Sequence, residues 1–289
     1  MSTVESDALV STAWLAEHLD HPGLRIVDAS YFVPGGIAPA LAQFQEAHIP
    51  GAQFFDINHV ADETNPKDHA FPDEDRFAKR VGELGINNGH RIIAYDHQGG
   101  ACAAARVWFL FRAFGHTQVS VLSGGRTAWM KEGRPVQSGP APAPTPQVFR
   151  AVHGRPPLRR RDEMRANIAA RDYQVLDARA AARFRGGAAE PRAGLRSGHI
   201  PGSRNLPFAE LFNTDTMTFK SPAELRAAFD AAGIDLNAPL TTTCGSGVTA
   251  CTLALGAYLI GKADVDIYDG SWLEWGADAD LPLATGPAT

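Results

Sequence analysis

Disulfide and metal frameworks are what this sequence lacks most plainly. It has only three cysteines in 289 residues, Cys102, Cys244 and Cys251, and no two of them form a C-x-x-C pair. The ten histidines show no metal-ligand spacing, so the residues give no positive evidence for a metal or an organic cofactor. A small, odd number of thiols suits a reducing compartment, and we expect the protein in the cytoplasm.

Basic charge and long apolar runs are also scarce. The formal net charge of −5 gives no reason to expect nucleic acid or an anionic membrane as a partner. The one basic run, residues 155–165, is interpreted as a solvated linker and helix face. The longest mostly apolar run, residues 248–260, is too short to span a bilayer and predicts a buried helix. Residues 1–15 lack the basic and apolar regions of a secretory signal peptide, so we expect none.

What the sequence does contain is an internal repeat. The phrase AHIPGAQFFDI at 47–57 returns as GHIPGSRNLPF at 198–208. In both places an apolar run ending in aspartate precedes it, and a strand-like run, a loop and a helix-like run follow it. Each copy closes with a strand, a glycine and a tryptophan. This order indicates a duplicated unit of about half the chain rather than a short solenoid repeat.

The domain organisation follows from the repeat. Alternating proline and small residues near position 141 indicate an extended linker, so we expect domains at 1–140 and 158–289 joined by a Pro-rich linker at 141–157. Within each copy short apolar strands alternate with helical patterns, which predicts an α/β fold with a parallel sheet flanked by helices. Ser221, Pro222 and Glu224 form a capping-box pattern that predicts a helix start.

The two copies serve as controls for each other. Both contain an aspartate (Asp28, Asp177) and a histidine (His48, His199), which are therefore interpreted as scaffold. Only the second copy places a cysteine, Cys244, where the first has Asp96. Only the second has arginines in the stretch between those paired residues, namely Arg179, Arg183, Arg185, Arg192 and Arg196. The first domain is therefore expected to be catalytically inactive and the second catalytic.

The loop after Cys244 suits a thiolate. A loop between a parallel strand and a helix lies where α/β proteins form ligand sites. Gly245 and Gly247 let several backbone N–H groups converge, and a helix expected to begin near Gly247 adds its positive end. Ser246 offers a hydroxyl to the same pocket. The alternative is that Cys244 is a small buried hydrophobe, as Cys251 and Cys102 are expected to be.

Cysteine-based phosphatases use a similar loop, but their signature places an arginine six residues after the cysteine. Here that position is Ala250, so phosphate chemistry would lack its bidentate donor.

At this point the residues resemble the rhodanese, or sulfurtransferase, family over nearly the whole chain, as two tandem rhodanese-like domains. CGSGVT at 244–249 is similar to the active loop of the branch that acts on 3-mercaptopyruvate. Thiosulfate sulfurtransferases typically carry Arg-Lys after the cysteine, where this chain has Gly245 and Ser246. The stretch from 177 to 202 and YDGSWLEWG at 268–276 also resemble the mercaptopyruvate branch.

The resemblance implies an enzyme that moves sulfur from 3-mercaptopyruvate to a thiol or cyanide. Cys244 would be the nucleophile, would carry the sulfur as a persulfide, and would release pyruvate. Thioredoxin or a small thiol would be the acceptor. The implied donor-binding residues are Arg183, Arg192, Gly245, Gly247, Val248 and Thr249.

A serine–histidine–aspartate relay has been proposed for the family. Ser246 matches its serine and His69 its histidine, but the aspartate position holds Asn58. An amide cannot carry the charge that would stabilise a histidinium. Either the relay is dispensable, or Asp56 or Asp62 substitutes, or backbone and solvent do the work.

Two other functions stay open from the sequence. One is thiosulfate:cyanide sulfurtransferase activity as the main role. The other is a non-catalytic sulfur carrier or binding module.

Overall fold

Two five-stranded sheets organise the chain, each in its own unit. The computed structural model describes residues 8–32, 37–97, 99, 103–152, 154 and 157–288. Unit 1 comprises Met1–Pro156 and Thr214–Thr218, and unit 2 comprises Pro157–Asn213 and Phe219–Thr289. The chain therefore passes from one unit to the other at the end of the Pro-rich stretch.

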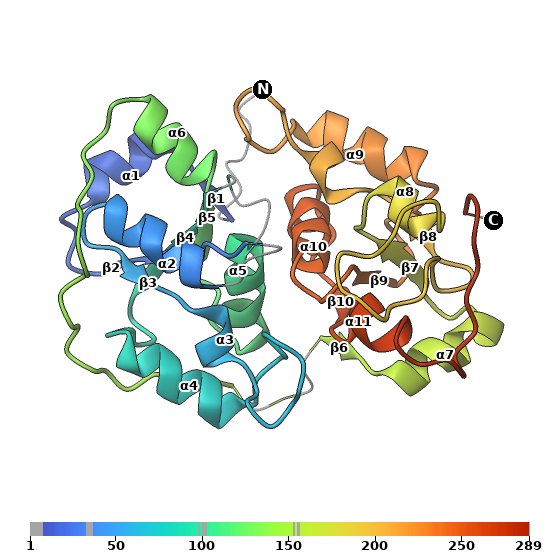
Figure 1. Cartoon of the computed structure of the whole chain (residues 1–289). Helices are drawn as coiled ribbons and strands as arrows, with labels where there is room; N and C mark the ends of the chain where they lie inside the picture. The colour runs from blue at the N-terminus through green and yellow to red at the C-terminus, as the bar shows by residue number, and fades with distance from the viewer. Residues whose placement is uncertain are drawn as a thin grey trace. The chain divides into compact units, whose positions relative to one another are not determined.

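The sheet of unit 1 is parallel throughout, with the strand order β1-β5-β4-β2-β3. The strands are β1 (Leu9–Val10), β2 (Leu24–Asp28), β3 (Gln53–Phe54), β4 (Arg91–Tyr95) and β5 (Val119–Leu122). The helices that flank the sheet (Figure 1) are α1 (Thr12–His18), α2 (Ile37–Glu46), α3 (Ile57–Val60), α4 (Glu74–Glu83), α5 (Ala103–Ala113) and α6 (Gly125–Lys131).

The sheet of unit 2 is also parallel, with the order β6-β10-β9-β7-β8. The strands are β6 (Leu158–Arg159), β7 (Gln174–Asp177), β8 (Arg204–Asn205), β9 (Leu240–Thr243) and β10 (Val265–Tyr268). The flanking helices are α7 (Arg161–Ala170), α8 (Ala181–Phe184), the 3-10 helix η1 (Phe208–Leu211), α9 (Pro222–Ala231), α10 (Ala250–Leu259) and α11 (Ser271–Trp275).

The two sheets have one topology. Strand by strand, β1, β2, β3, β4 and β5 correspond to β6, β7, β8, β9 and β10, and the order across the sheet is the same. The predicted α/β fold with two flanked parallel sheets is confirmed. In each unit the third strand across the sheet, β4 or β9, is the one whose end carries Asp96 or Cys244.

The histidines shared by the two copies make matching scaffold contacts. The Nδ1 atoms of His48 and His199 lie 2.8 Å from the carbonyl oxygens of Phe44 and Phe184. Each imidazole stacks on the ring of that same phenylalanine, with centroids 4.0 Å and 3.8 Å apart. Both histidines are buried. These contacts tie a loop to a helix in each unit and explain why both copies retain a histidine.

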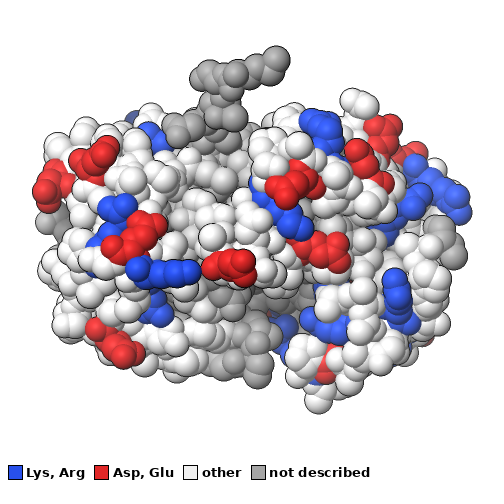
Figure 2. Space-filling model, turned by 90° about the horizontal axis from the view of Figure 1, so that it is seen from above, with Lys and Arg blue, Asp and Glu red and all other residues white. Residues whose placement is uncertain are grey.

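The apolar run at 248–260 becomes α10, which is buried along most of its length and packs on β9 and β10. The Ser221 hydroxyl accepts from the Glu224 amide, and the Glu224 carboxylate accepts from the Ser221 amide, so the predicted capping box starts α9. Among the described residues, no helix combines the length and the apolar character that crossing a bilayer would need. Figure 2 shows acidic and basic side chains interspersed over the face that it presents.

Candidate functional site

Cys244 follows β9 directly, at the carboxyl end of a strand that lies between β10 and β7. Ligand sites of parallel α/β sheets form at this end of the strands. Cys244 is only 2% exposed, and both it and Cys251 are free thiols. Burial disfavours a charge on the sulfur unless polar groups compensate for the lost water. Cys102 lies outside the described residues.

Two backbone amides face the sulfur. The Gly247 amide donates to Cys244 Sγ at 3.0 Å, and the Ser246 amide donates at 3.4 Å. Converging N–H dipoles of this kind form a site suited to negative charge. Gly247 has a φ of +88°, and a Cβ there would lie 2.8 Å from Asp269 Oδ1 and from the Asp269 carbonyl oxygen. The loop therefore needs a glycine at 247 to close around the sulfur.

The helix after the loop begins later than expected. α10 starts at Ala250, three residues beyond Gly247, because Val248 and Thr249 form a tight turn. In that turn the Cys251 amide donates to the Val248 carbonyl at 3.1 Å. The expectation of a helix beginning near Gly247 is therefore wrong. The amides that reach the sulfur belong to the loop, not to the first turn of α10.

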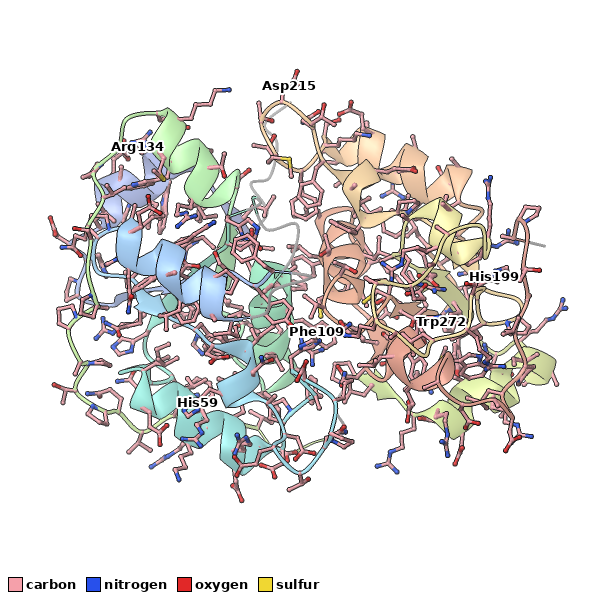
Figure 3. All side chains as sticks on the ribbon, in the orientation of Figure 1. His59, Phe109, Arg134, His199, Asp215 and Trp272 are labelled. Carbon is pink, nitrogen blue, oxygen red and sulfur yellow. The ribbon has the colours of Figure 1, made fainter. Side chains whose placement is uncertain are left out.

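The other side of the loop is held by α11. The Trp272 amide donates to the Cys244 carbonyl and the Leu273 amide to the Gly245 carbonyl, both at 2.9 Å. Trp272 is labelled in Figure 3. The Gly245 carbonyl and the Ser246 amide belong to one planar trans peptide, so they point in opposite directions. Holding that carbonyl against α11 therefore aims the Ser246 N–H at the sulfur.

Arg183, on α8, lies beside the loop. A Cβ built on Gly245 would be 3.2 Å from Arg183 Nη2. Arg183 Nε donates to Glu190 Oε2 at 3.2 Å, and Nη2 contacts the same oxygen. The Arg183 side chain is 26% exposed, whereas that of Glu190 is 1% exposed. Glu190 therefore fixes the guanidinium and leaves N–H donors of Nη1 and Nη2 for an incoming anion.

Glu190 is fixed in turn by a buried arginine. Arg179 Nη1 donates to Glu190 Oε1 at 2.8 Å, and Arg179 Nη2 donates to Asp177 Oδ2 at 2.7 Å. The side chains of all three are 1% exposed. The Arg179 guanidinium also lies over the Trp272 ring, 4.3 Å from its centroid. A chain of charge pairs thus runs from the scaffold aspartate of β7 to Arg183.

The described residues of unit 1 contain no such chain of charge pairs. The residue two positions after Asp28 is Ser30 rather than an arginine, and its amide donates to Asp28 Oδ1 at 2.9 Å. Burial raises the pKa of Asp28 above its ordinary value, although hydrogen bonds from Ser30 and Tyr95 and the charge of Arg126 act in the opposite direction. Asp96, at the position of Cys244, accepts the Ala104 amide at 3.0 Å through Oδ2.

The remaining residues predicted from the sequence are placed as follows. Ser246 and Val248 are buried in the loop, and Thr249 is half-buried at its end. Arg192 is half-buried in the turn after Glu190, and no ion pair holds its guanidinium within the described ranges. Within the part of the chain that the structure describes, no cluster of three or more His, Cys, Asp or Glu side chains suits a metal ion.

His69 belongs to unit 1, not to the unit of Cys244. It is 2% exposed, its φ is +50°, and it meets the Tyr31 ring edge-on at 5.2 Å. The two carboxylates that could replace the missing aspartate have local partners. Asp56 accepts the Asn58 amide at the start of α3, and Asp62 accepts the Thr64 hydroxyl, which lowers the pKa of Asp62.

Sequence reasoning missed Glu190 and Ser271 and noted Arg179 only as one of five arginines. Glu190 had a usable signal, because it lies between Arg183 and Arg192 in the segment that differs between the copies. Two of the hydrogen-bond partners of Ser271, Thr243 and Cys244, come from another part of the chain, so no local pattern marks it.

Comparisons with known proteins agree with one another. The family model described as "Rhodanese-like domain" matches residues 11–132 and 160–278. A 3-mercaptopyruvate sulfurtransferase of Homo sapiens is 45% identical over 273 residues, which cover 93% of this chain and 91% of the relative. A thiosulfate sulfurtransferase of Bos taurus is 48% identical over 274 residues, with the same coverage of both chains.

Among solved structures, the crystal structure of SseA from Escherichia coli is similar to this chain. The TM-score is 0.81 at 35% sequence identity, and the match covers 91% of this chain and 98% of SseA. That structure is described as showing the "Rhodanese" fold and the catalytic mechanism of 3-mercaptopyruvate sulfotransferases.

Proposed function

This chain belongs to the rhodanese family, and from that premise we propose that it is a sulfurtransferase that moves sulfur from 3-mercaptopyruvate to a thiol or cyanide. Cys244 is the nucleophile in this proposal. The observation that carries it is a buried sulfur facing two loop amides, with the Arg183 guanidinium beside the same loop.

In the first half-reaction the Cys244 thiolate attacks the sulfur of the donor. The S–S bond forms while the C–S bond breaks, and the electron pair of the C–S bond leaves on carbon as the enolate of pyruvate, which then takes a proton. The Ser246 and Gly247 amides stabilise the anionic sulfur in the loop. In the second half-reaction an acceptor thiolate or cyanide attacks the outer sulfur, and Cys244 leaves as thiolate.

The donor carboxylate and carbonyl are assigned to Arg183 and Arg192. Guanidinium groups match planar carboxylates, and Glu190 already holds Arg183 in place. Gly245, Gly247, Val248 and Thr249 supply the backbone around the reacting sulfur. Ser246 and His69 are proposed as contributors to proton handling, with no requirement for a complete relay.

Thiosulfate is the second candidate donor, because relatives named for it reach 48% identity, slightly more than those named for 3-mercaptopyruvate. Overall identity therefore does not separate the donors. The charge of the loop distinguishes the two donors better. Gly245 and Ser246 carry no charge, whereas cationic side chains at these positions would favour the binding of a dianion such as thiosulfate.

Three further assignments accompany the proposal. Unit 1 is catalytically inactive, because the Asp96 carboxylate at the position of Cys244 cannot form a persulfide. The acceptor is a small thiol or thioredoxin, which carries a nucleophilic thiolate. The protein acts in the cytoplasm, where Cys244 stays reduced.

Steady-state kinetics with both donors on the wild type test the proposal, with Cys244→Ala as the control. A kcat/KM for 3-mercaptopyruvate well above that for thiosulfate supports it, and the reverse preference overturns the donor assignment. A persulfide on Cys244 that forms but never turns over indicates a carrier instead. Release of phosphate from an aryl phosphate, abolished by Cys244→Ser, would indicate a phosphatase.

A further inference from the structure

Ser271 carries a backbone conformation that side chains rarely adopt. It is the first residue of α11, is fully buried, and has a φ of +53°. This is the left-handed region, in which a residue with a Cβ is strained and glycine is not. Strain of this kind persists where surrounding contacts hold it, often at functional sites.

The matching position of unit 1 shows that the turn itself needs no side chain. Gly125 starts α6 there with a φ of +55°. The backbone amide of the following residue makes the same bond in both units. The Arg126 amide donates to the Asp96 carbonyl at 3.0 Å, and the Trp272 amide donates to the Cys244 carbonyl at 2.9 Å. A Cβ on Gly125 would lie 2.3 Å from that Asp96 oxygen, so unit 1 has no room for a side chain.

In unit 2 the serine hydroxyl fills this place and uses all its hydrogen-bonding capacity. It accepts the Cys244 amide at 3.2 Å and the Thr243 hydroxyl at 3.3 Å. It donates to the Tyr268 carbonyl at 2.8 Å. One buried side chain therefore ties the end of β9 to the end of β10 at the residue that carries the reactive sulfur.

These contacts determine where the sulfur points. The Cys244 amide is held by Ser271 Oγ, and the Cys244 carbonyl is held by the Trp272 amide, so both peptide groups of Cys244 are fixed. With its backbone fixed, the Cys244 side chain faces the Ser246 and Gly247 amides. Without the hydroxyl, the buried Cys244 N–H would lose its partner, and the loop would be free to rotate toward another one.

We propose that Ser271 is a positioning residue, which accepts backbone strain in order to hold the Cys244 peptide so that the sulfur faces the loop amides. The inference rests on the proposed role of Cys244 as nucleophile. It goes beyond that role, because it explains why the unit with the cysteine has a strained serine where its sister unit has an unstrained glycine.

The experiment compares Ser271→Ala and Ser271→Gly with the wild type and with Ser203→Ala. Ser203 is a matched control, because its buried hydroxyl donates to the Ile200 carbonyl at 2.6 Å in the same unit, away from the loop. The measurements are the rate of alkylation of Cys244 by iodoacetamide, followed by peptide mass spectrometry, and the melting temperature. Alkylation needs no sulfur donor.

Both Ser271 variants are expected to slow alkylation of Cys244 by about tenfold, the effect of one lost hydrogen bond. Ser271→Gly should melt at a higher temperature than Ser271→Ala, because glycine relieves the strain while the loss of reactivity stays the same. Ser203→Ala should lower the melting temperature without changing the alkylation rate.

An unchanged alkylation rate in Ser271→Ala would overturn the proposal, and so would equal slowing in Ser203→Ala. Reactivity that tracks the melting temperature across all three variants would also overturn it, because it would show a purely structural role. If Ser271 controls alkylation but no sulfur donor is turned over, the positioning role stands and the proposed function fails.

Discussion

Replacing Arg183 by alanine tests whether the guanidinium beside Gly245 binds the donor carboxylate. Hydrogen bonds to charged groups contribute about 1.5–3 kcal/mol each. Every 1.4 kcal/mol is a factor of ten, so Arg183→Ala should lower kcat/KM for 3-mercaptopyruvate by about 10- to 150-fold. The loss for thiosulfate should be smaller, because thiosulfate has no carboxylate for this guanidinium to bind.

The structure indicates that this variant folds. Removing Arg183 takes one cation from Glu190 Oε2, but Arg179 still binds Glu190 Oε1 at 2.8 Å. Arg183 is also the partly exposed member of the network, whereas Arg179 is almost wholly buried. The change should therefore appear mainly in KM rather than in the melting temperature. Arg192→Ala should show the same donor preference.

Arg185→Ala is the matched control for the lost charge. Arg185 follows α8 two residues after Arg183 and is exposed, so its removal changes the net charge equally without touching Gly245. The assay is steady-state kinetics of each variant with both donors. Equal losses on both donors, or an equal loss in Arg185→Ala, would refute the idea that Arg183 binds the carboxylate.

Three further predictions concern the interior. Cys251→Ala should keep kcat within about threefold of the wild type, because the bond that the Cys251 thiol donates to the Gly247 carbonyl, at 3.4 Å, is weak. Abolished turnover in a well-folded Cys251 variant would show that Cys244 does not act alone. Burial raises the pKa of Asp28 in the folded protein. The favourable contribution of Asp28 to the free energy of unfolding is therefore complete below the pKa of the unfolded chain, about 3.9, and is lost as the pH rises through the pKa of the folded state. Asp28→Asn should therefore stabilise unit 1 at pH 7 but not at pH 3. Asp177→Asn should destabilise unit 2 by about 3 kcal/mol, because it leaves buried Arg179 short of a partner. Thermal unfolding of the Asp28→Asn and Asp177→Asn variants at pH 7 and pH 3 tests these expectations. Stabilisation by both substitutions at pH 7 would contradict them.

The duplicated fold could be predicted because each half repeats the same order of apolar runs and turns. The strand order confirms that reasoning, and the scaffold histidines make the same contacts in both units. The position of Cys244 after β9 could also be predicted, because the glycines and small residues that follow it mark the end of the strand. These features depend on local patterns and on comparison within the chain, both of which a single sequence contains.

The contacts that complete the site could not be predicted in the same way. Ser271 is 27 residues from Cys244, and its importance depends on a φ angle and on three bonds that only the packed loop creates. The start of α10 was misplaced because Val248 and Thr249 favour a tight turn once Gly247 has bent around the sulfur. Local propensity does not report such tertiary demands.

The charge pairs connect the scaffold of unit 2 to its chemistry. Asp177 matches Asp28, yet in unit 2 this carboxylate binds Arg179. Arg179 in turn binds Glu190, and Glu190 holds Arg183 beside Gly245. Each ion in this series is buried or half-buried, and a buried ion is stable only while its partner is present. A change at Arg179 must therefore be transmitted to Arg183, although the two guanidinium groups are joined only through Glu190. Arg179 and Arg183, which look like members of a surface cluster in the sequence, are thus joined through Glu190, and the proposal places the donor carboxylate against Arg183, the more exposed of the two.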